Sequence, residues 1–269
     1  MSEAPGEGQA SAPGAEATAR APWPRPVFTG LWVWAAAVGV LLLCRFVLGP
    51  LIPFLAANLK AVAVLVFLYL PVWLMGRRGE RLRDYGLRFD RWKSDLLWAG
   101  GTLLVVYPPF ILLFWGFLEV LPLLGDPWAS WLAPYGDLST LRPAFRLPDD
   151  FLLLAGTHLI VVAFPEELFY RGFLWARLAE GLGSGEGEGS DLRGLRLLGV
   201  VVGPAFLLTA LLFALGHLTE PYPWRLAVFF PALLFGWLRL RSGGLLAPIL
   251  VHGFSNLFMA TLEASFLGG

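Results

Sequence analysis

Three short groups of polar residues could carry out chemistry in this sequence, and each interrupts an apolar run. The first is FPEELFYRGF (164–173), which holds two glutamates and an arginine and follows fourteen residues, FLLLAGTHLIVVAF, in which one histidine is the only ionisable group. The second is FALGH (213–217) and the third is HGFSN (252–256). An ionisable side chain within a membrane helix costs about 2.5–3.5 kcal/mol on insertion scales, so each group needs a reason to be there.

The two glutamates of the first group are expected to have different environments. Glu167 and Arg171 are four residues apart, so a helix places them on one face, where the guanidinium neutralises that carboxylate. Glu166 points about 100° away and lacks that partner. A carboxylate without a counter-ion suits a group that transfers protons near neutral pH.

The other two groups repeat the four-residue spacing. Phe213 precedes His217 by one turn, and His252 precedes Asn256 by one turn. Any one group alone is explained by hydrogen bonds between helices. Together, a carboxylate, two imidazoles and an amide provide a base for water, a second proton carrier and donors for an oxyanion. We find no serine or cysteine nucleophile paired with them by an obvious spacing, so water is the expected attacker.

A metal site is the alternative chemistry for these residues. Two histidines and two glutamates could ligate zinc, but the HExxH signature is absent. The single cysteine, Cys44, provides neither a disulfide nor a cysteine-type zinc site. Asn256 is a neutral amide and a poor zinc ligand. We therefore predict no cofactor and disfavour zinc.

The composition indicates the fold class. Hydrophobic residues make up 57% of the 269 residues, charged residues only 15%, and the mean hydropathy is +0.66. Soluble domains carry about 25% charged residues, so this chain faces lipid. Its 20 basic and 20 acidic residues cancel, which gives no electrostatic case for nucleic acid. We predict an all-α, polytopic integral membrane protein with about 7–8 transmembrane helices.

Apolar runs locate the expected helices. Residues 1–27 are rich in Ala, Gly, Pro, Ser and Glu, lack signal-peptide features and are predicted to form a disordered tail before a helical membrane domain at 28–269. The catalytic core is expected at about 150–269. Seven spans are predicted, and an eighth is possible if one long run is broken; the seven lie at 28–49, 53–76, 96–122, 150–180, 195–216, 224–241 and 245–266.

The loops predict the orientation. RRGERLRDYGLRFDRWK (77–93) is the strongest basic cluster, and the positive-inside rule places it in the cytoplasm. The N-terminus is then cytoplasmic as well, and Arg239 and Arg241 end a later span on the same side. The absence of targeting signals and the Gly/Ala/Pro-rich tail favour a multi-pass protein of the bacterial inner membrane.

The depth of the polar groups presents a difficulty. If every span crossed fully, His217 would lie near the outer end of its helix and His252 nearer the inner end, and neither could share a site with Glu166. Gly216, Pro221 and Pro223 favour an early end of the helix that carries His217. Irregular backbone at membrane depth is tolerated where it lines a wet cavity.

The ordered motifs EExxxR, FxxxH and HxxxN resemble the three-motif pattern of the CPBP family. That family includes the CAAX prenyl endopeptidases of the Ras-converting type and bacterial relatives described as bacteriocin-processing or self-immunity proteins. The resemblance covers about 150–269 and implies a polytopic intramembrane protease. The family was first described as metalloproteases and is now generally regarded as glutamate-dependent and metal-free.

The resemblance also implies roles for individual residues. Glu166 would activate water with His217, and His252 and Asn256 would stabilise the oxyanion. The structural support of the site would come from Glu167, Arg171 and Phe213. The expected partners are the lipid bilayer and a membrane-associated protein or peptide substrate, whose identity stays open.

Two other functions remain as alternatives. A non-catalytic binding partner or bacteriocin-immunity-type protein could use the same fold, but all the key polar positions are filled. A small-solute transporter would show paired repeats and broken helices in matching halves, and neither is evident.

Overall fold

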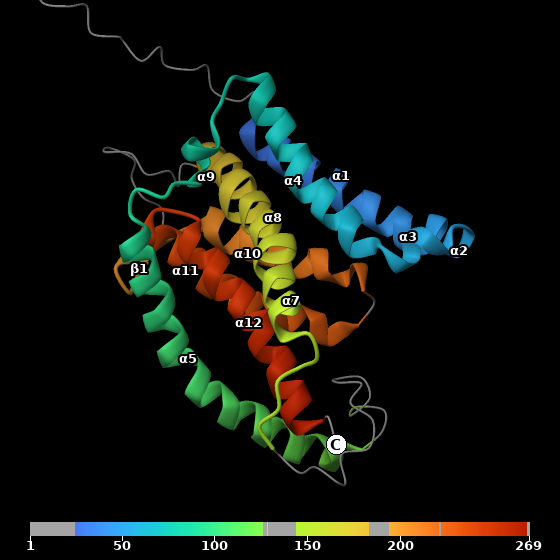
Figure 1. Ribbon diagram of the computed structural model, residues 1–269. Coiled ribbons are helices and arrows are strands. Elements are labelled where there is room, and N and C mark those ends of the chain that lie inside the picture. Colours follow the sequence, from blue (N-terminus) through green and yellow to red (C-terminus); the bar gives the residue numbers. More distant parts are fainter. Residues whose placement is uncertain (1–24, 126–127, 129–143, 183–193, 221, 268–269) are drawn as a thin grey trace, which may run out of the picture.

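The computed structural model describes residues 25–125, 128, 144–182, 194–220 and 222–267, and most of these residues are helical (Figure 1). The α-helices are α1 (Pro26–Leu43), α2 (Gly49–Leu51), α3 (Pro53–Ala57), α4 (Leu59–Arg77), α5 (Trp92–Val120), α7 (Phe151–Gly156), α8 (Phe164–Glu167), α9 (Trp175–Leu182), α10 (Pro204–Gly216), α11 (Phe229–Ser242) and α12 (Leu246–Phe266). The π-helical segments are Cys44–Leu48, Thr157–Ala163 and Leu168–Leu174, and the 3₁₀ segments are Leu82–Tyr85, Leu121–Leu124, His217–Thr219 and Pro223–Val228. The strands β1 (Leu195–Leu197) and β2 (Val200–Val202) pair as an antiparallel hairpin.

Among the residues that the structure describes, four helical stretches are long and apolar enough to cross a membrane. They are Pro26–Leu51, Leu59–Arg77, Trp92–Leu124 and Phe151–Leu182. Large apolar side chains lie exposed along them, for example Leu104 at 78%. Apolar surfaces of this kind are typical of membrane-facing helices. The chain is therefore an all-α membrane protein, and the number of seven to eight spans remains a prediction.

The predicted span at 195–216 is wrong in its first third. The hairpin β1–β2 occupies its start, and helix α10 begins only at Pro204. Leu198 and Gly199 form the tight turn with positive φ angles of 48° and 81°, a backbone conformation that a helix cannot contain. The apolar run concealed this turn because hydropathy alone does not distinguish a short strand from a helix.

Helix α10 is too short on its own to span a bilayer. It contains 13 residues, which at 1.5 Å per residue gives about 20 Å, against about 30 Å of hydrocarbon. Helix α10 ends at Gly216, and two 3₁₀ segments carry the chain into α11. Because α10 begins only at Pro204, the helix that ends at Gly216 is short, and His217 does not have to lie a full bilayer thickness from its start.

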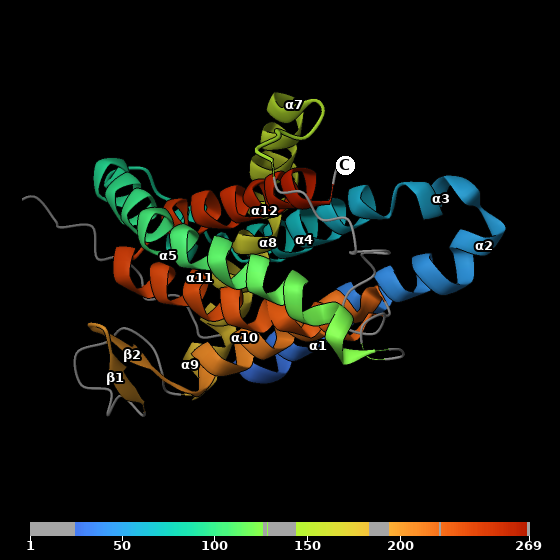
Figure 2. The same cartoon turned by 90° about the horizontal axis from the view of Figure 1, so that it is seen from below.

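The packing places α12 at the centre of the second half of the chain. It packs against α5, α11 and the π-helical segment Thr157–Ala163, while α1 packs against α4 and α9 (Figures 1 and 2). Helix α5 continues through Pro108 and Pro109 and curves along the outside of the bundle (Figure 1).

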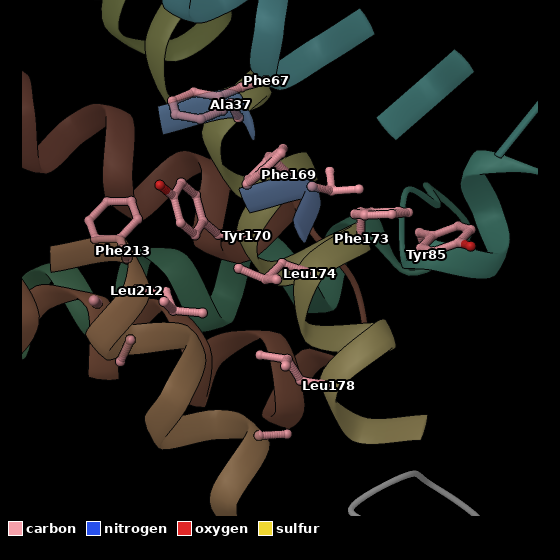
Figure 3. Close-up of a cluster of buried hydrophobic side chains, with 14 of the residues drawn as sticks. Ala37, Phe67, Tyr85, Phe169, Tyr170, Phe173, Leu174, Leu178, Leu212 and Phe213 are labelled. Atoms are coloured by element: carbon pink, nitrogen blue, oxygen red, sulfur yellow. The ribbon is translucent and has the colours of Figure 1, made fainter. Parts of the chain in front are cut away.

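The largest buried cluster joins the two halves of the chain. It is built around the aromatic residues Phe169, Tyr170, Phe173 and Phe213, with contributions from α1, α4, α9 and α10 (Figure 3). Phe169 and Phe173 are completely buried. Core residues therefore flank Arg171 on both sides along the chain and fix the position of the first polar group.

Candidate active site

The first polar group lies where α8 passes into the π-helical segment Leu168–Leu174. Within it, Nη1 of Arg171 lies 3.0 Å from Oε1 of Glu167, and the two side chains are 2% and 0% exposed. Nη2 of Arg171 donates a second hydrogen bond, of 3.0 Å, to the carbonyl of Ala232 on α11. Because a buried charge is tolerated only when it is paired and hydrogen-bonded, this arrangement fixes α8 against α11.

His252, on α12, lies between the two adjacent glutamates. Its Nδ1 atom is 2.8 Å from Oε1 of Glu167, a hydrogen bond. Its Nε2 atom is 3.8 Å from Oε2 of Glu166, which is too long for one. The side chain of Glu166 is 18% exposed, whereas that of Glu167 is wholly buried. Of the two carboxylates, only Glu166 is both accessible and free of the arginine.

His217 follows directly after α10, in a 3₁₀ turn. Its Nδ1 atom lies 2.9 Å from the carbonyl oxygen of Phe213, four residues earlier. A carbonyl can only accept, so Nδ1 must carry the proton and, in the neutral ring, Nε2 carries the lone pair. Glu166 and His252 both act electrostatically on His217, so the three groups share one neighbourhood. The geometry brings a proton acceptor on His217 to the same region as the accessible carboxylate.

The ring of Phe213 joins the remaining groups. Its centroid lies 4.6 Å from that of His217 and 5.9 Å from that of His252, and Cζ of Arg171 lies 4.3 Å from it. Its other neighbour is Tyr170, edge-on at 4.9 Å (Figure 3). An aromatic face attracts a cation, so the ring holds the guanidinium as well as both imidazoles.

Asn256 is less closely tied to the site. It lies one turn after His252 on α12 and is partly buried. Among the described residues, no hydrogen bond or ion pair joins it to Glu166, Glu167 or His217. Its part in the chemistry therefore stays a prediction that rests on the motif.

Sequence reasoning missed several residues that complete the site. Phe235 stacks on His252 with centroids 4.7 Å apart and planes inclined by 15°, and the Ala232 carbonyl accepts from Arg171. Arg239, one turn after Phe235, is 6% exposed, and the sequence indicated it only as the end of a span. The α-helical spacing 232, 235, 239 was the signal that placed these three residues on one face.

The polar groups of the site can be compared with what a zinc ion requires. Within the described part of the chain, no three His, Cys, Asp or Glu side chains are placed to hold a metal ion. Oε1 of Glu167 is already shared by Arg171 and His252. Structural and catalytic zinc sites need at least three protein ligands with free lone pairs.

Comparison with known proteins finds a family match over the segment that holds this site. Residues 148–258 match the family model described as type II CAAX prenyl endopeptidase, Rce1-like, and this segment contains all three polar groups. The match covers less than half of the chain, and it shows that this segment is similar to that family of endopeptidases. Neither a curated protein nor a solved structure matches the chain.

Proposed function

We propose that this protein is a glutamate-dependent intramembrane endopeptidase that hydrolyses a peptide bond in a membrane-associated protein or peptide. The observation that carries the proposal is the unequal pair of glutamates, because Glu167 is buried and held by Arg171, whereas Glu166 is accessible and lies beside two imidazoles. The family match over residues 148–258 supports the reaction class.

The first chemical step is the attack of water on the scissile carbonyl carbon. Glu166 accepts the proton of that water, and His217 assists through its unprotonated Nε2 atom. The new C–O bond forms as the carbonyl π electrons move to oxygen, which gives a tetrahedral oxyanion. Collapse of this intermediate breaks the C–N bond, and the proton held by Glu166 passes to the leaving amine nitrogen. The products are a carboxylic acid and an amine, which become a carboxylate and an ammonium ion when the second proton of the water moves to the amine.

The oxyanion is stabilised by His252 and Asn256. The Nδ1–H of His252 donates to Glu167, so an imidazolium on His252 would be held by that carboxylate and present Nε2–H on its other side. The amide of Asn256, one turn further along α12, would provide a second donor. This division of roles explains why the motif contains two adjacent glutamates: Glu166 reacts, and Glu167 organises His252.

The reaction needs no metal ion on this proposal. The shared Oε1 of Glu167 and the neutral amide of Asn256 both support water activated by a carboxylate instead of a zinc-bound water. We also propose that the protein resides in the bacterial inner membrane with its N-terminus in the cytoplasm, as the basic loop at 77–93 predicts.

The proposal is tested by incubating the purified protein in lipid nanodiscs with a library of membrane-tethered peptides, both lipidated and unlipidated. Wild type should cleave a subset, and His217→Ala and His252→Ala should lower kcat by about 10²–10⁴-fold, the contribution typical of a general base or an oxyanion donor. Mass spectrometry of the products locates the cleaved bond and thereby the substrate class. Full activity in both variants would contradict the assignment of the two imidazoles. Saturable peptide binding by wild type without any cleavage would favour the binding-partner function.

A further inference from the structure

Arg239 is a buried arginine that the proposed chemistry does not use. It is 6% exposed, and its Nε atom donates a 3.3 Å hydrogen bond to the backbone carbonyl of Arg171. Its guanidinium carbon lies 5.2 Å from the ring of Trp175. Burying a second guanidinium in a membrane protein is expensive, so its contacts require a reason beyond the orientation of the chain.

Gly86, in the loop between α4 and α5, forms the other wall around Arg239. The φ angle of Gly86 is +90°, and a Cβ atom placed there would lie 2.8 Å from Cζ of Arg239 and 2.9 Å from Nη2. The carbonyl of Gly86 accepts a 2.8 Å hydrogen bond from the backbone N–H of Leu245, at the start of α12. Glycine is required here for both its backbone conformation and the close approach of the guanidinium.

These contacts continue into the site without a gap. Arg239 holds the backbone of Arg171, the Arg171 side chain holds Glu167, and Glu167 holds Nδ1 of His252. The whole series is at least 94% buried, because its exposed fractions are 6%, 2%, 0% and 4% for Arg239, Arg171, Glu167 and His252. Displacement of the guanidinium of Arg239 therefore moves the group that orients His252.

We propose that Arg239 is a positioning residue of the active site, seated by Gly86, and that the loop between α4 and α5 is part of the scaffold that orients His252. This inference rests on the proposed function for its kinetic consequence but not for its structural one. Arg239 does not touch the reacting atoms; it acts through Arg171 and Glu167. Misplacement of a catalytic group by about 1 Å costs about 10²-fold in rate, so loss of Arg239 should lower kcat and leave KM unchanged.

The kinetic test compares Arg239→Gln, Arg239→Lys and Gly86→Ala with wild type in nanodiscs. We expect about a 10- to 100-fold fall in kcat for Arg239→Gln. Arg239→Lys should recover part of this loss, because lysine keeps a donor but lacks the planar group that lies against Gly86. Arg241→Gln is the matched control. Arg241 is exposed and its guanidinium carbon lies 4.5 Å from the ring of Trp98, so this substitution should leave kcat unchanged. Equal kcat in Arg239→Gln and Arg241→Gln would overturn the proposal.

A double variant tests whether Gly86 affects kcat through Arg239. If Gly86 acts by seating the guanidinium, then Gly86→Ala lowers kcat in wild type but has no further effect on kcat in an Arg239→Ala background. Thermal unfolding of each variant measures any general loss of stability separately. Additive effects of Gly86→Ala in both backgrounds would show that the loop affects activity by another route.

An NMR measurement does not depend on any substrate. The Nδ1–H of His252 that donates to Glu167 should give a downfield proton resonance, assigned by its loss in His252→Gln. Arg239→Gln and Gly86→Ala should shift or broaden it, and Arg241→Gln should leave it in place. An unmoved resonance in both variants would overturn the inference even if the protein cleaves no peptide. A shifted resonance with unchanged cleavage in Glu166→Gln would instead retain the inference and reject the proposed function.

Discussion

Nδ1 of His252 lies 2.8 Å from Oε1 of Glu167, although 85 residues separate the two positions along the chain. The hydrogen bond joins α12 to α8 within the buried interior, where its strength is greater than at a surface. It also fixes which nitrogen of His252 carries a proton and aims the other toward Glu166, at 3.8 Å. Glu167 thus orients the imidazole, and Glu166 is the glutamate that we propose as the base.

Loss of Arg171 should destabilise the protein severely. Arg171→Gln leaves the carboxylate of Glu167 buried without its cation, which typically costs about 3–5 kcal/mol in the free energy of unfolding. The expected result is a large fall in the thermal midpoint of the detergent-solubilised protein, measured by intrinsic tryptophan fluorescence. As control, Arg83→Gln removes an exposed pair with Asp90 at 3.8 Å and should change stability by less than about 1 kcal/mol. Equal effects of the two changes would show that the buried pair is not a stabilising contact.

Gly216 should be essential because the end of α10 touches the hydroxyl of Tyr170. A Cβ atom at Gly216 would lie 2.5 Å from that oxygen. Gly216→Ala should therefore displace His217, the next residue, and destabilise the protein by about 1–3 kcal/mol. Removing the hydroxyl relieves the clash, so the double variant with Tyr170→Phe should regain both thermal stability and kcat. Failure of Tyr170→Phe to rescue would place the effect of Gly216→Ala elsewhere.

Truncation of Phe213 should affect stability and activity together. Phe213→Ala opens a cavity beside Arg171, His217 and His252 and should cost about 3–5 kcal/mol, measured by chemical unfolding in mixed micelles. Phe213→Leu keeps most of the volume but removes the aromatic face. It should therefore retain most of the stability and lose more in kcat than in thermal midpoint. Proportional losses in both quantities would mean that the ring only fills space.

Removal of metal ions should leave the activity unchanged. No metal takes part in the proposed mechanism, so dialysis against a strong chelator should not alter kcat in the nanodisc assay. Loss of activity that added zinc restores would contradict the metal-free proposal and require different roles for Glu166 and His252. Inductively coupled plasma mass spectrometry of the purified protein provides the independent check, with an expected zinc content well below one ion per chain.

The sequence was sufficient to predict most helices because their apolar runs are long and uniform. The span at 245–266 agrees with α12 at Leu246–Phe266 within one residue. The early end of α10 followed from Gly216 and the prolines after it, and the structure confirms this end. The hairpin β1–β2 was missed because three-residue strands leave no periodicity to detect.

For the site, the sequence could predict contacts within one helix but not contacts between helices. A spacing of four residues determines which side chains share a face, so the ion pair of Glu167 with Arg171 could be expected. Which helix a face meets depends on tertiary packing, so the bond from His252 to Glu167 could not be read from spacing. The contacts of Arg239 could not be predicted for the same reason, because the loop that covers it lies far away along the chain.

The most direct test of the central claim is kcat of Glu166→Gln on a peptide that wild type cleaves. The substitution keeps the size of the side chain and removes only the ability to take a proton from water. The control is Glu119→Gln, an exposed glutamate on α5 bonded to Trp115, which should be fully active. We expect a loss of at least about 10³-fold in kcat for Glu166→Gln with unchanged thermal stability. Wild-type kcat in Glu166→Gln would contradict it.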